Sequence, residues 1–211
     1  MAQLRVCFVG DSITNGTGDS GFLGWPGRLC ASEVTDGHDL TDYNLGIRGD
    51  TSADLLPRWR AECEARLPAS VSCAIVINIG LNDATEQDGG VIRVSMGDSI
   101  RNMRDILSGA MALHPTLWVG PTPVDDSLMP LQADTGETRD KRNARTADYN
   151  LAFKALAYEL DVPYLDMLSK LINTPDWLGM LSDGLHPLPA GHERMAEIVK
   201  AWDGWRGLLA D

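Results

Sequence analysis

The sequence predicts an α/β fold, a three-layer α/β/α sandwich built on about five parallel strands. Short apolar segments rich in Val, Ile and Leu alternate with longer amphipathic segments along the whole chain. Each connection is long enough for a right-handed crossover between parallel strands. The chain has 211 residues, close to the length of one domain, so we expect a single domain over residues 1–211.

Five apolar segments are expected to form the sheet. Each is short and rich in Val, Ile or Leu, as in strands buried on both faces, and most are followed by Gly, Pro or Asp, which favour turns at strand ends. The expected strands cover residues 4–9, 40–45, 73–79, 117–119 and 162–165. Five strands separated by helices in this way are typical of a flavodoxin-like sandwich. The pattern leaves the order of the strands within the sheet open.

Helical patterns fill the intervals between these strands. Trp25 and Pro26 open the first helix, because proline suits the first helical turn. The other helices are expected over residues 52–67, 92–113, 142–160 and 190–209.

Charge and composition exclude several classes of function. The chain has 18 Lys and Arg against 30 Asp and Glu, a net charge of −12 that repels phosphate backbones, so we expect no nucleic-acid partner. The longest apolar stretch, residues 71–81, is far shorter than the ~20 residues of a transmembrane helix. The amino terminus lacks the features of a secretory signal, which favours a cytoplasmic location. The cysteines form no CxxC pair and are expected to be buried reduced thiols: Cys7, Cys30, Cys63 and Cys73.

Small polar loops follow three of the strands. They read GDSIT at residues 10–14, GIRGDT at 46–51 and GLND at 80–83. A fourth loop, SDGLHP at 182–187, precedes the last helix. Open parallel sheets bind ligands beyond the carboxyl ends of their strands, so we expect a functional site where these loops meet.

The four loops contain the groups needed for acyl transfer. A serine hydroxyl such as that of Ser12 needs an adjacent base, and His186 suits this task near neutral pH. Asp183 lies three residues before His186, so one turn can bring its carboxylate to the imidazole and fix the tautomer. The oxyanion also needs donors, and the candidates are the backbone N–H of Ser12, the backbone N–H of Gly49 and the amide of Asn82.

These loops resemble the motif blocks of the SGNH hydrolases, also called GDSL lipases and esterases. The blocks match in order at residues 10–13, 44–51, 80–83 and 183–187. The resemblance implies a flavodoxin-like fold with Ser12 as nucleophile, His186 as base and Asp183 as the residue that orients it. It also implies an oxyanion hole made by Ser12, Gly49 and Asn82. Gly49 is preferred over Gly46 because the family's glycine precedes Asp-Thr.

The resemblance implies a serine esterase that cleaves carboxylic esters through an acyl-enzyme, with no metal or organic cofactor. Its expected partner is a small-molecule ester with a short- to medium-chain acyl group, or a lysophospholipid. A carbohydrate deacetylase and a thioesterase remain alternatives on the same site. A flavodoxin-like protein that binds flavin or a nucleotide is the non-enzymatic alternative.

Two further segments have more than one interpretation. Trp177, Leu178 and Met180 come just before the Asp-x-x-His turn and are candidates for an acyl pocket, with packing in the core or in a lid as the alternative. The basic run at residues 139–145 is expected to start a solvated helix, with contact to an anionic substrate group as the alternative.

Overall fold

Five parallel strands form the central sheet, as the sequence predicts. The computed structural model describes residues 2–133 and 136–210. The strands are β1 (Gln3–Gly10), β2 (Asp39–Gly46), β3 (Cys73–Asn78), β6 (Thr116–Val119) and β9 (Tyr164–Leu165). They lie in the order β2-β1-β3-β6-β9, which is the 2-1-3-4-5 order of a flavodoxin-like sheet when its strands are counted along the chain.

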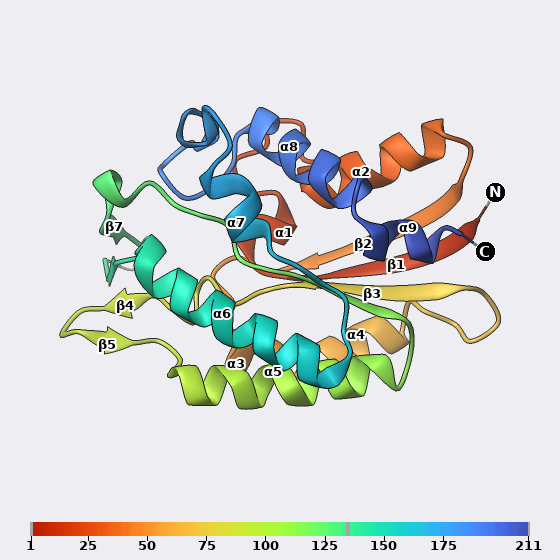
Figure 1. Ribbon diagram of the computed structural model, residues 1–211, viewed down its shortest axis with the longest axis horizontal. Helices are drawn as coiled ribbons and strands as arrows, with labels where there is room; N and C mark the ends of the chain where they lie inside the picture. Colours follow the sequence, from red (N-terminus) through yellow and green to blue (C-terminus); the bar gives the residue numbers. More distant parts are fainter. Residues whose placement is uncertain (1, 134–135, 211) are drawn as a thin grey trace.

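Helices cover both faces of this sheet, and Figure 1 shows the three layers edge on. One face carries α1 (Ser12–Asn15), α2 (Gly24–Thr35), α7 (Met167–Ile172), α8 (Pro189–Lys200) and α9 (Asp203–Leu208). The other face carries α3 (Ser52–Leu55), α4 (Trp59–Glu64), α5 (Met96–Met111) and α6 (Asn143–Leu160).

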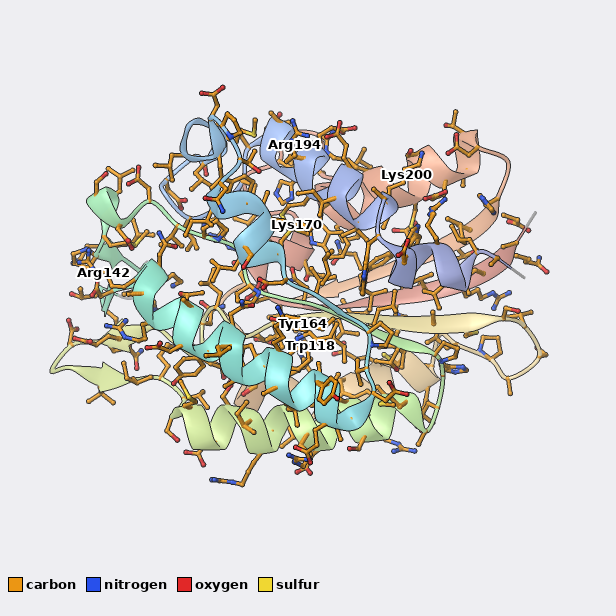
Figure 2. All side chains as sticks on the ribbon, in the orientation of Figure 1. Trp118, Arg142, Tyr164, Lys170, Arg194 and Lys200 are labelled. Carbon is orange, nitrogen blue, oxygen red and sulfur yellow. The ribbon has the colours of Figure 1, made fainter. Side chains whose placement is uncertain are left out.

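Side chains alternate between the two faces along each strand, so the sheet separates two apolar cores. In β1, Val6 and Phe8 enter the core beneath α2 and α8, where Phe8 contacts Trp25 edge to face at 5.3 Å. Val9 points the other way, into the core beneath α5 and α6. That second core includes Trp118, which lies beside Tyr164 with ring centroids 5.1 Å apart (Figure 2).

Three of the expected helices differ from the structure. The helix expected over residues 52–67 is two short helices, α3 and α4, because Pro57 in the turn between them cannot donate a helical hydrogen bond. The helix expected from residue 92 begins at Met96, and Ser95 caps it. The helix expected over residues 190–209 ends at Lys200, and α9 follows after an extended Trp202.

Two small hairpins, absent from the elements expected from the sequence, lie at the carboxyl end of the sheet. One pairs β4 (Glu86–Gln87) with β5 (Val91–Ile92), and the other pairs β7 (Leu131–Gln132) with β8 (Thr138–Arg139). An antiparallel bridge between Glu86 and Asp140 joins them. In Figure 1 both hairpins lie at the end of the molecule where the strands terminate, so they add walls to the expected site.

The four cysteines are buried free thiols, as expected. Within residues 2–133 and 136–210, the structure contains no helix with the length and apolar character required to span a membrane.

Candidate active site

Ser12 lies at the junction between the first strand and the first helix. The Asp11 side chain accepts a hydrogen bond from the Ile13 N–H at 2.9 Å and so caps α1, which begins at Ser12. The first N–H groups of a helix have no partner within it, so the Ser12 N–H is available to an anion at this end. Ser12 is 6% exposed, with its hydroxyl at the edge of a cavity.

The loop before α8 brings Asp183 and His186 to this serine. The Ser182 N–H donates to the His186 carbonyl at 2.8 Å, and Gly184 takes a positive φ of 81°, so the loop folds back on itself. His186 Nδ1 lies 2.7 Å from Asp183 Oδ2, and His186 Nε2 lies 3.0 Å from Ser12 Oγ. With its proton on Nδ1, the ring donates to Asp183 and accepts from the serine hydroxyl.

Asp183 is held as a carboxylate. Burial alone would raise its pKa, but hydrogen bonds from the His186 ring and from the backbone N–H groups of His186 and Leu185 hold the pKa well below its usual value. The same carboxylate therefore faces the imidazole at every pH near neutrality and fixes the orientation of the ring.

Gly49 lines the cavity beside Ser12, whereas Gly46 does not. Gly49 has a φ of 83°, which favours glycine, and the nearest atom to a side chain built there would be Arg139 Nη1 at 3.7 Å. A Cβ on Gly46 would lie 2.3 Å from the Asn15 backbone nitrogen, so that glycine allows β2 to pack against α1. Gly49 is therefore the glycine that faces the cavity, and Gly46 is the one that packs against α1.

Asn82 reaches the same cavity from the loop after β3. Its amide nitrogen lies 2.9 Å from the Asp50 carbonyl and 3.3 Å from Asp11 Oδ2, which orients the NH₂ group at the cavity wall. The next residue, Asp83, is fully buried and accepts hydrogen bonds from the Ser52 N–H at 2.7 Å and the Ser99 hydroxyl at 2.5 Å. Asp83 therefore ties the Asn82 loop to the helices α3 and α5.

The five residues of the expected catalytic triad and oxyanion hole line one cavity of about 490 Å³. They come from four loops, and their shared position at the carboxyl end of the sheet follows from the parallel topology. Leu131 and Leu185 supply apolar wall, and they belong to a small buried cluster with Leu81 and Met129.

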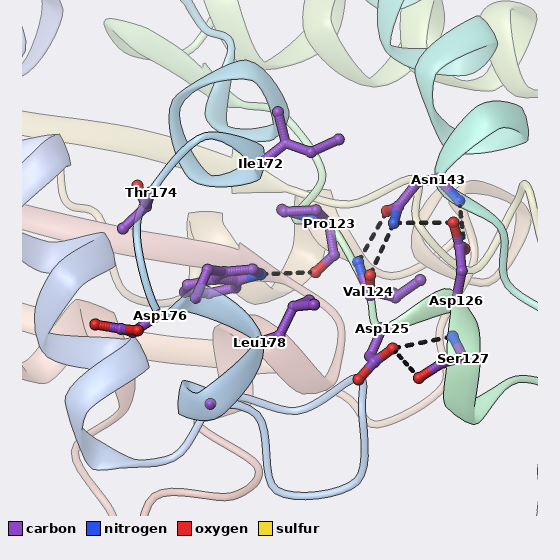
Figure 3. Close-up of a pocket in the computed structure, with 12 residues that line it drawn as sticks. Pro123, Val124, Asp125, Asp126, Ser127, Asn143, Ile172, Thr174, Asp176 and Leu178 are labelled. Carbon is purple, nitrogen blue, oxygen red and sulfur yellow. Dashed lines mark hydrogen bonds between the residues drawn. The ribbon is translucent and has the colours of Figure 1, made fainter.

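The three residues proposed for an acyl pocket lie elsewhere. Trp177 and Leu178 line a second cavity of about 600 Å³, which Figure 3 shows. Trp177 is buried there, and its indole N–H donates to the Pro123 carbonyl at 3.0 Å. Met180 lines neither cavity; its carbonyl accepts from the Leu188 N–H, and it packs against the core beneath α8. The structure therefore does not bring these three residues to Ser12.

Four cations line the Ser12 cavity: Arg48, Arg93, Arg139 and Lys141. Of these, only Arg139 and Lys141 belong to the basic run that was expected to start a solvated helix, with contact to an anionic substrate group as the alternative. The structure begins α6 after them, at Asn143, and turns both side chains toward the cavity. Arg48 lies in the predicted loop at residues 46–51, but no motif marks its side chain as cavity lining, and Arg93 follows a hairpin that the sequence does not predict.

The arrangement has the parts of a proton relay next to a reactive hydroxyl. A partly buried alcohol, an imidazole and a carboxylate form one hydrogen-bonded chain, and backbone and amide donors flank the alcohol. Such a site can attack a carbonyl carbon and stabilise the negative oxygen that results.

Comparisons with known proteins identify a family for this chain. The sequence pattern of the GDSL-like lipase/acylhydrolase family matches residues 8–194. The chain is also 26% identical over 201 residues to an arylesterase from Vibrio mimicus, covering 94% of this chain and 87% of that protein.

Several solved structures share the fold. A lipase/acylhydrolase from Enterococcus faecalis superposes with a TM-score of 0.79 at 20% identity, over 98% of this chain and 97% of that one. TesA gives a TM-score of 0.71 at 24% identity, over 97% and 99% of the two chains. A catalytic mutant of an acetylxylan esterase from Geobacillus stearothermophilus gives 0.69 at 21% identity, over 94% and 93%. The matched segment contains all four motif loops, and the chain belongs to the GDSL-like lipase/acylhydrolase family and is a carboxylic ester hydrolase.

Proposed function

We propose that this hydrolase works through an acyl-enzyme in which Ser12 is the nucleophile, His186 the general base and Asp183 the residue that orients the base. The observation that carries this proposal is the hydrogen-bonded chain from Ser12 Oγ through the two ring nitrogens of His186 to Asp183 Oδ2, at 3.0 and 2.7 Å. Each member depends on the next, because the hydroxyl needs a base and the base needs a fixed tautomer.

In the first half of the reaction, Ser12 Oγ attacks the ester carbonyl carbon while its proton passes to His186 Nε2. The electron pair of the carbonyl double bond moves to the oxygen, which receives hydrogen bonds from the N–H groups of Ser12 and Gly49 and from the Asn82 amide. The tetrahedral intermediate then collapses, the bond to the alcohol oxygen breaks, and His186 returns the proton to the leaving alcohol.

In the second half, water takes the place of the alcohol. His186 accepts a proton from the water as its oxygen attacks the acyl carbon, and the same donors hold the second oxyanion. Collapse breaks the bond to Ser12 Oγ, which regains the proton from His186 as the acid leaves.

The proposed substrates are carboxylic esters with short- to medium-chain acyl groups. The cavity around Ser12 holds about 490 Å³ with two leucines in its wall, room for a small acyl group and its alcohol. The similarity to an arylesterase and to an acetylxylan esterase supports small acyl groups. Lysophospholipids, acetylated sugars and thioesters are the alternative substrate classes, and they are compared with simple esters in the experiment described below.

Kinetics of Ser12→Ala test the proposal. We expect kcat for nitrophenyl esters to fall by a factor of ~10⁴ or more, because loss of a triad nucleophile removes the covalent route. Ser127→Ala is the matched control, since Ser127 is exposed and lines the second cavity. Near-native turnover by Ser12→Ala would refute the assignment.

A series of nitrophenyl esters of increasing chain length, run beside acetylated sugars, lysophospholipids and acyl thioesters, tests the substrate class. We expect the highest kcat/KM with acyl chains of short to medium length. A maximum at long chains would contradict the proposed class while leaving the roles of Ser12 and His186 in place.

A further inference from the structure

The cavity around Ser12 is richer in positive charge than the chain that forms it. Four of its lining residues are Arg or Lys and three are Asp, whereas the whole chain has 18 Lys and Arg against 30 Asp and Glu. All three carboxylates already have partners, and Asp54 pairs with Arg93 at 3.9 Å. Asp50 pairs with Arg58 at 2.8 Å, and Asp183 holds His186. A net positive site has therefore been built into a strongly acidic protein.

The second hairpin is what turns two of these cations toward the serine. Successive side chains of an extended segment point to opposite sides, so Arg139 and Lys141 share one side while Asp140 lies on the other. The bridge between Asp140 and Glu86 fixes this register. Farther along the basic run, Arg142 and Arg145 turn away from the cavity and pair with Asp140 and Glu86.

Lys141 is the most unusual of the four. It is 3% exposed and lines the cavity, and in the described part of the chain no hydrogen bond or ion pair holds its ammonium. Burial lowers the pKa of Lys141 to about 8, and the charges of Arg139 and Arg93 also lower it. A buried cation without a partner is costly, and a negative group bound in the cavity would offset that cost.

Arg139 and Arg93 stand on the Gly49 side of the cavity. Arg93 Nη1 donates to the Gly49 carbonyl at 2.9 Å, and Arg139 Nη1 lies 3.7 Å from the position of a Cβ on Gly49. The Arg139 Nε is buried and, among the described residues, has no hydrogen-bond partner. Both arginine side chains line the cavity next to the proposed oxyanion hole, where the part of the substrate adjoining the carbonyl would lie, and Arg139 Nη2 also pairs with Glu137 at 3.2 Å.

We propose that the enzyme prefers esters carrying an anionic group, a carboxylate or a phosphate, a few bonds from the scissile carbonyl, and that Lys141 and Arg139 bind this group. This inference rests on the proposed function, because it places the anion relative to a carbonyl at Ser12. Arg48, exposed at the rim, adds to the field that draws such a substrate in.

The test compares kcat/KM for matched anionic and neutral esters. For charge on the alcohol, para-acetoxybenzoate is paired with para-acetoxybenzamide, and para-acetoxyphenyl phosphate with its neutral dimethyl ester. For charge on the acyl group, monophenyl glutarate is paired with its monoamide. We expect the anionic member to be preferred at least about tenfold in one arm, because charge-assisted hydrogen bonds contribute that much. The arm that responds identifies the source of the negative charge.

Two variants then locate the binding groups. Lys141→Met and Arg139→Gln are each expected to reduce the anionic-to-neutral ratio by about tenfold or more. Arg139→Gln keeps the test valid if Lys141→Met fails to fold. The matched control is Lys170→Met, which removes the same charge from an exposed site on α7 (Figure 2). We expect this control to leave the ratio unchanged.

The outcomes separate this inference from the proposed function. Equal kcat/KM within all three pairs would overturn the inference while hydrolysis of the neutral esters still supported the esterase. A ratio that survives both cavity variants, or that falls equally in Lys170→Met, would also overturn it. Failure to hydrolyse any of the esters, neutral or anionic, would instead count against the proposed function.

Discussion

The two cavities at the carboxyl end of the sheet differ in what they can do. The one lined by Trp177 and Leu178 is larger, at about 600 Å³ against about 490 Å³, and it has an apolar wall with three aspartates at its edges. The smaller one holds Ser12 and His186. A backbone hydrogen bond links the segments beside the two cavities, since the Asp125 N–H donates to the Gly184 carbonyl at 2.8 Å.

The difference shows that convergence of polar groups, and not volume, identifies the reactive site. In the larger cavity, the polar side chains already satisfy one another: Asn143 bonds to Val124 and Asp126, and Ser127 bonds to Asp125 (Figure 3). In the smaller cavity, the Ser12 hydroxyl faces His186, and four Arg and Lys side chains line the wall with three aspartates. A bound carbonyl or anion would therefore find hydrogen-bond donors in the smaller cavity, whereas the polar groups named in the larger cavity already bond to one another.

Each cavity has one asparagine amide in its wall, and removing these amides one at a time should give the largest difference in kcat between the two cavities. Asn82→Ala should lower kcat for ester hydrolysis by ~10²- to 10³-fold with a smaller change in KM, because it removes a donor that acts mainly in the transition state. Asn143→Ala removes an amide from the other cavity and should change kcat less than about twofold. Steady-state kinetics measure both. Equal losses in the two variants would mean that the cavities are not functionally distinct.

A second prediction concerns pH and the charge of Lys141. Below a pKa of about 8 the ammonium is charged, and above it the group is neutral, so the preference for anionic esters should weaken as pH rises through about 8. Arginine side chains stay charged in this range, and the pKa values of Asp11, raised to about 6 by burial, and of Asp183, held low by hydrogen bonds, lie below it, so part of the preference should remain. The ratio of kcat/KM for an anionic and a neutral ester measures this, because any change in activity that is common to both substrates cancels in the ratio. A ratio constant from pH 7 to pH 10 would contradict the role of Lys141.

The smallest catalytic effect is expected in the larger cavity. Trp177→Phe removes the hydrogen bond to Pro123 and some buried volume, which should lower the free energy of unfolding by about 1–3 kcal/mol. The dependence of kcat/KM on acyl chain length should not change. Leu178→Ala, at a side chain 54% exposed, should alter stability by less than about 0.5 kcal/mol. A shift of the chain-length optimum in either variant would assign the acyl group to this cavity.

Much of the fold follows from sequence because apolar strand patterns report burial on both faces of a parallel sheet. All five expected strands of the sheet form. Helix boundaries were less accurate, since the break at Pro57 and the extended Trp202 depend on how each segment packs. The two-residue strands of the hairpins are too short to carry a hydrophobic period.

The candidate site also contains residues that the sequence predicts and residues that it does not. Ser12, Asn82 and His186 lie in local motifs that follow strands or precede a helix, so sequence alone predicted that they would meet. Trp177 shows the limit of that reasoning, because closeness to Asp183 in the chain did not put it in the same cavity. For Arg139 and Lys141 the sequence offered contact with an anionic group only as an alternative, and for Arg93 it offered nothing, because loop and hairpin geometry decides which side chains line the cavity.

The central claim, that one serine hydroxyl is activated by His186, is tested most directly by labelling with an alkyl fluorophosphonate ester and weighing the intact protein. We predict one adduct on the wild-type chain and on Ser127→Ala, mapped to the peptide containing Ser12, and no adduct on Ser12→Ala. His186→Ala should label far more slowly. An adduct that persists in Ser12→Ala, or a wild-type chain that takes none, would contradict the claim.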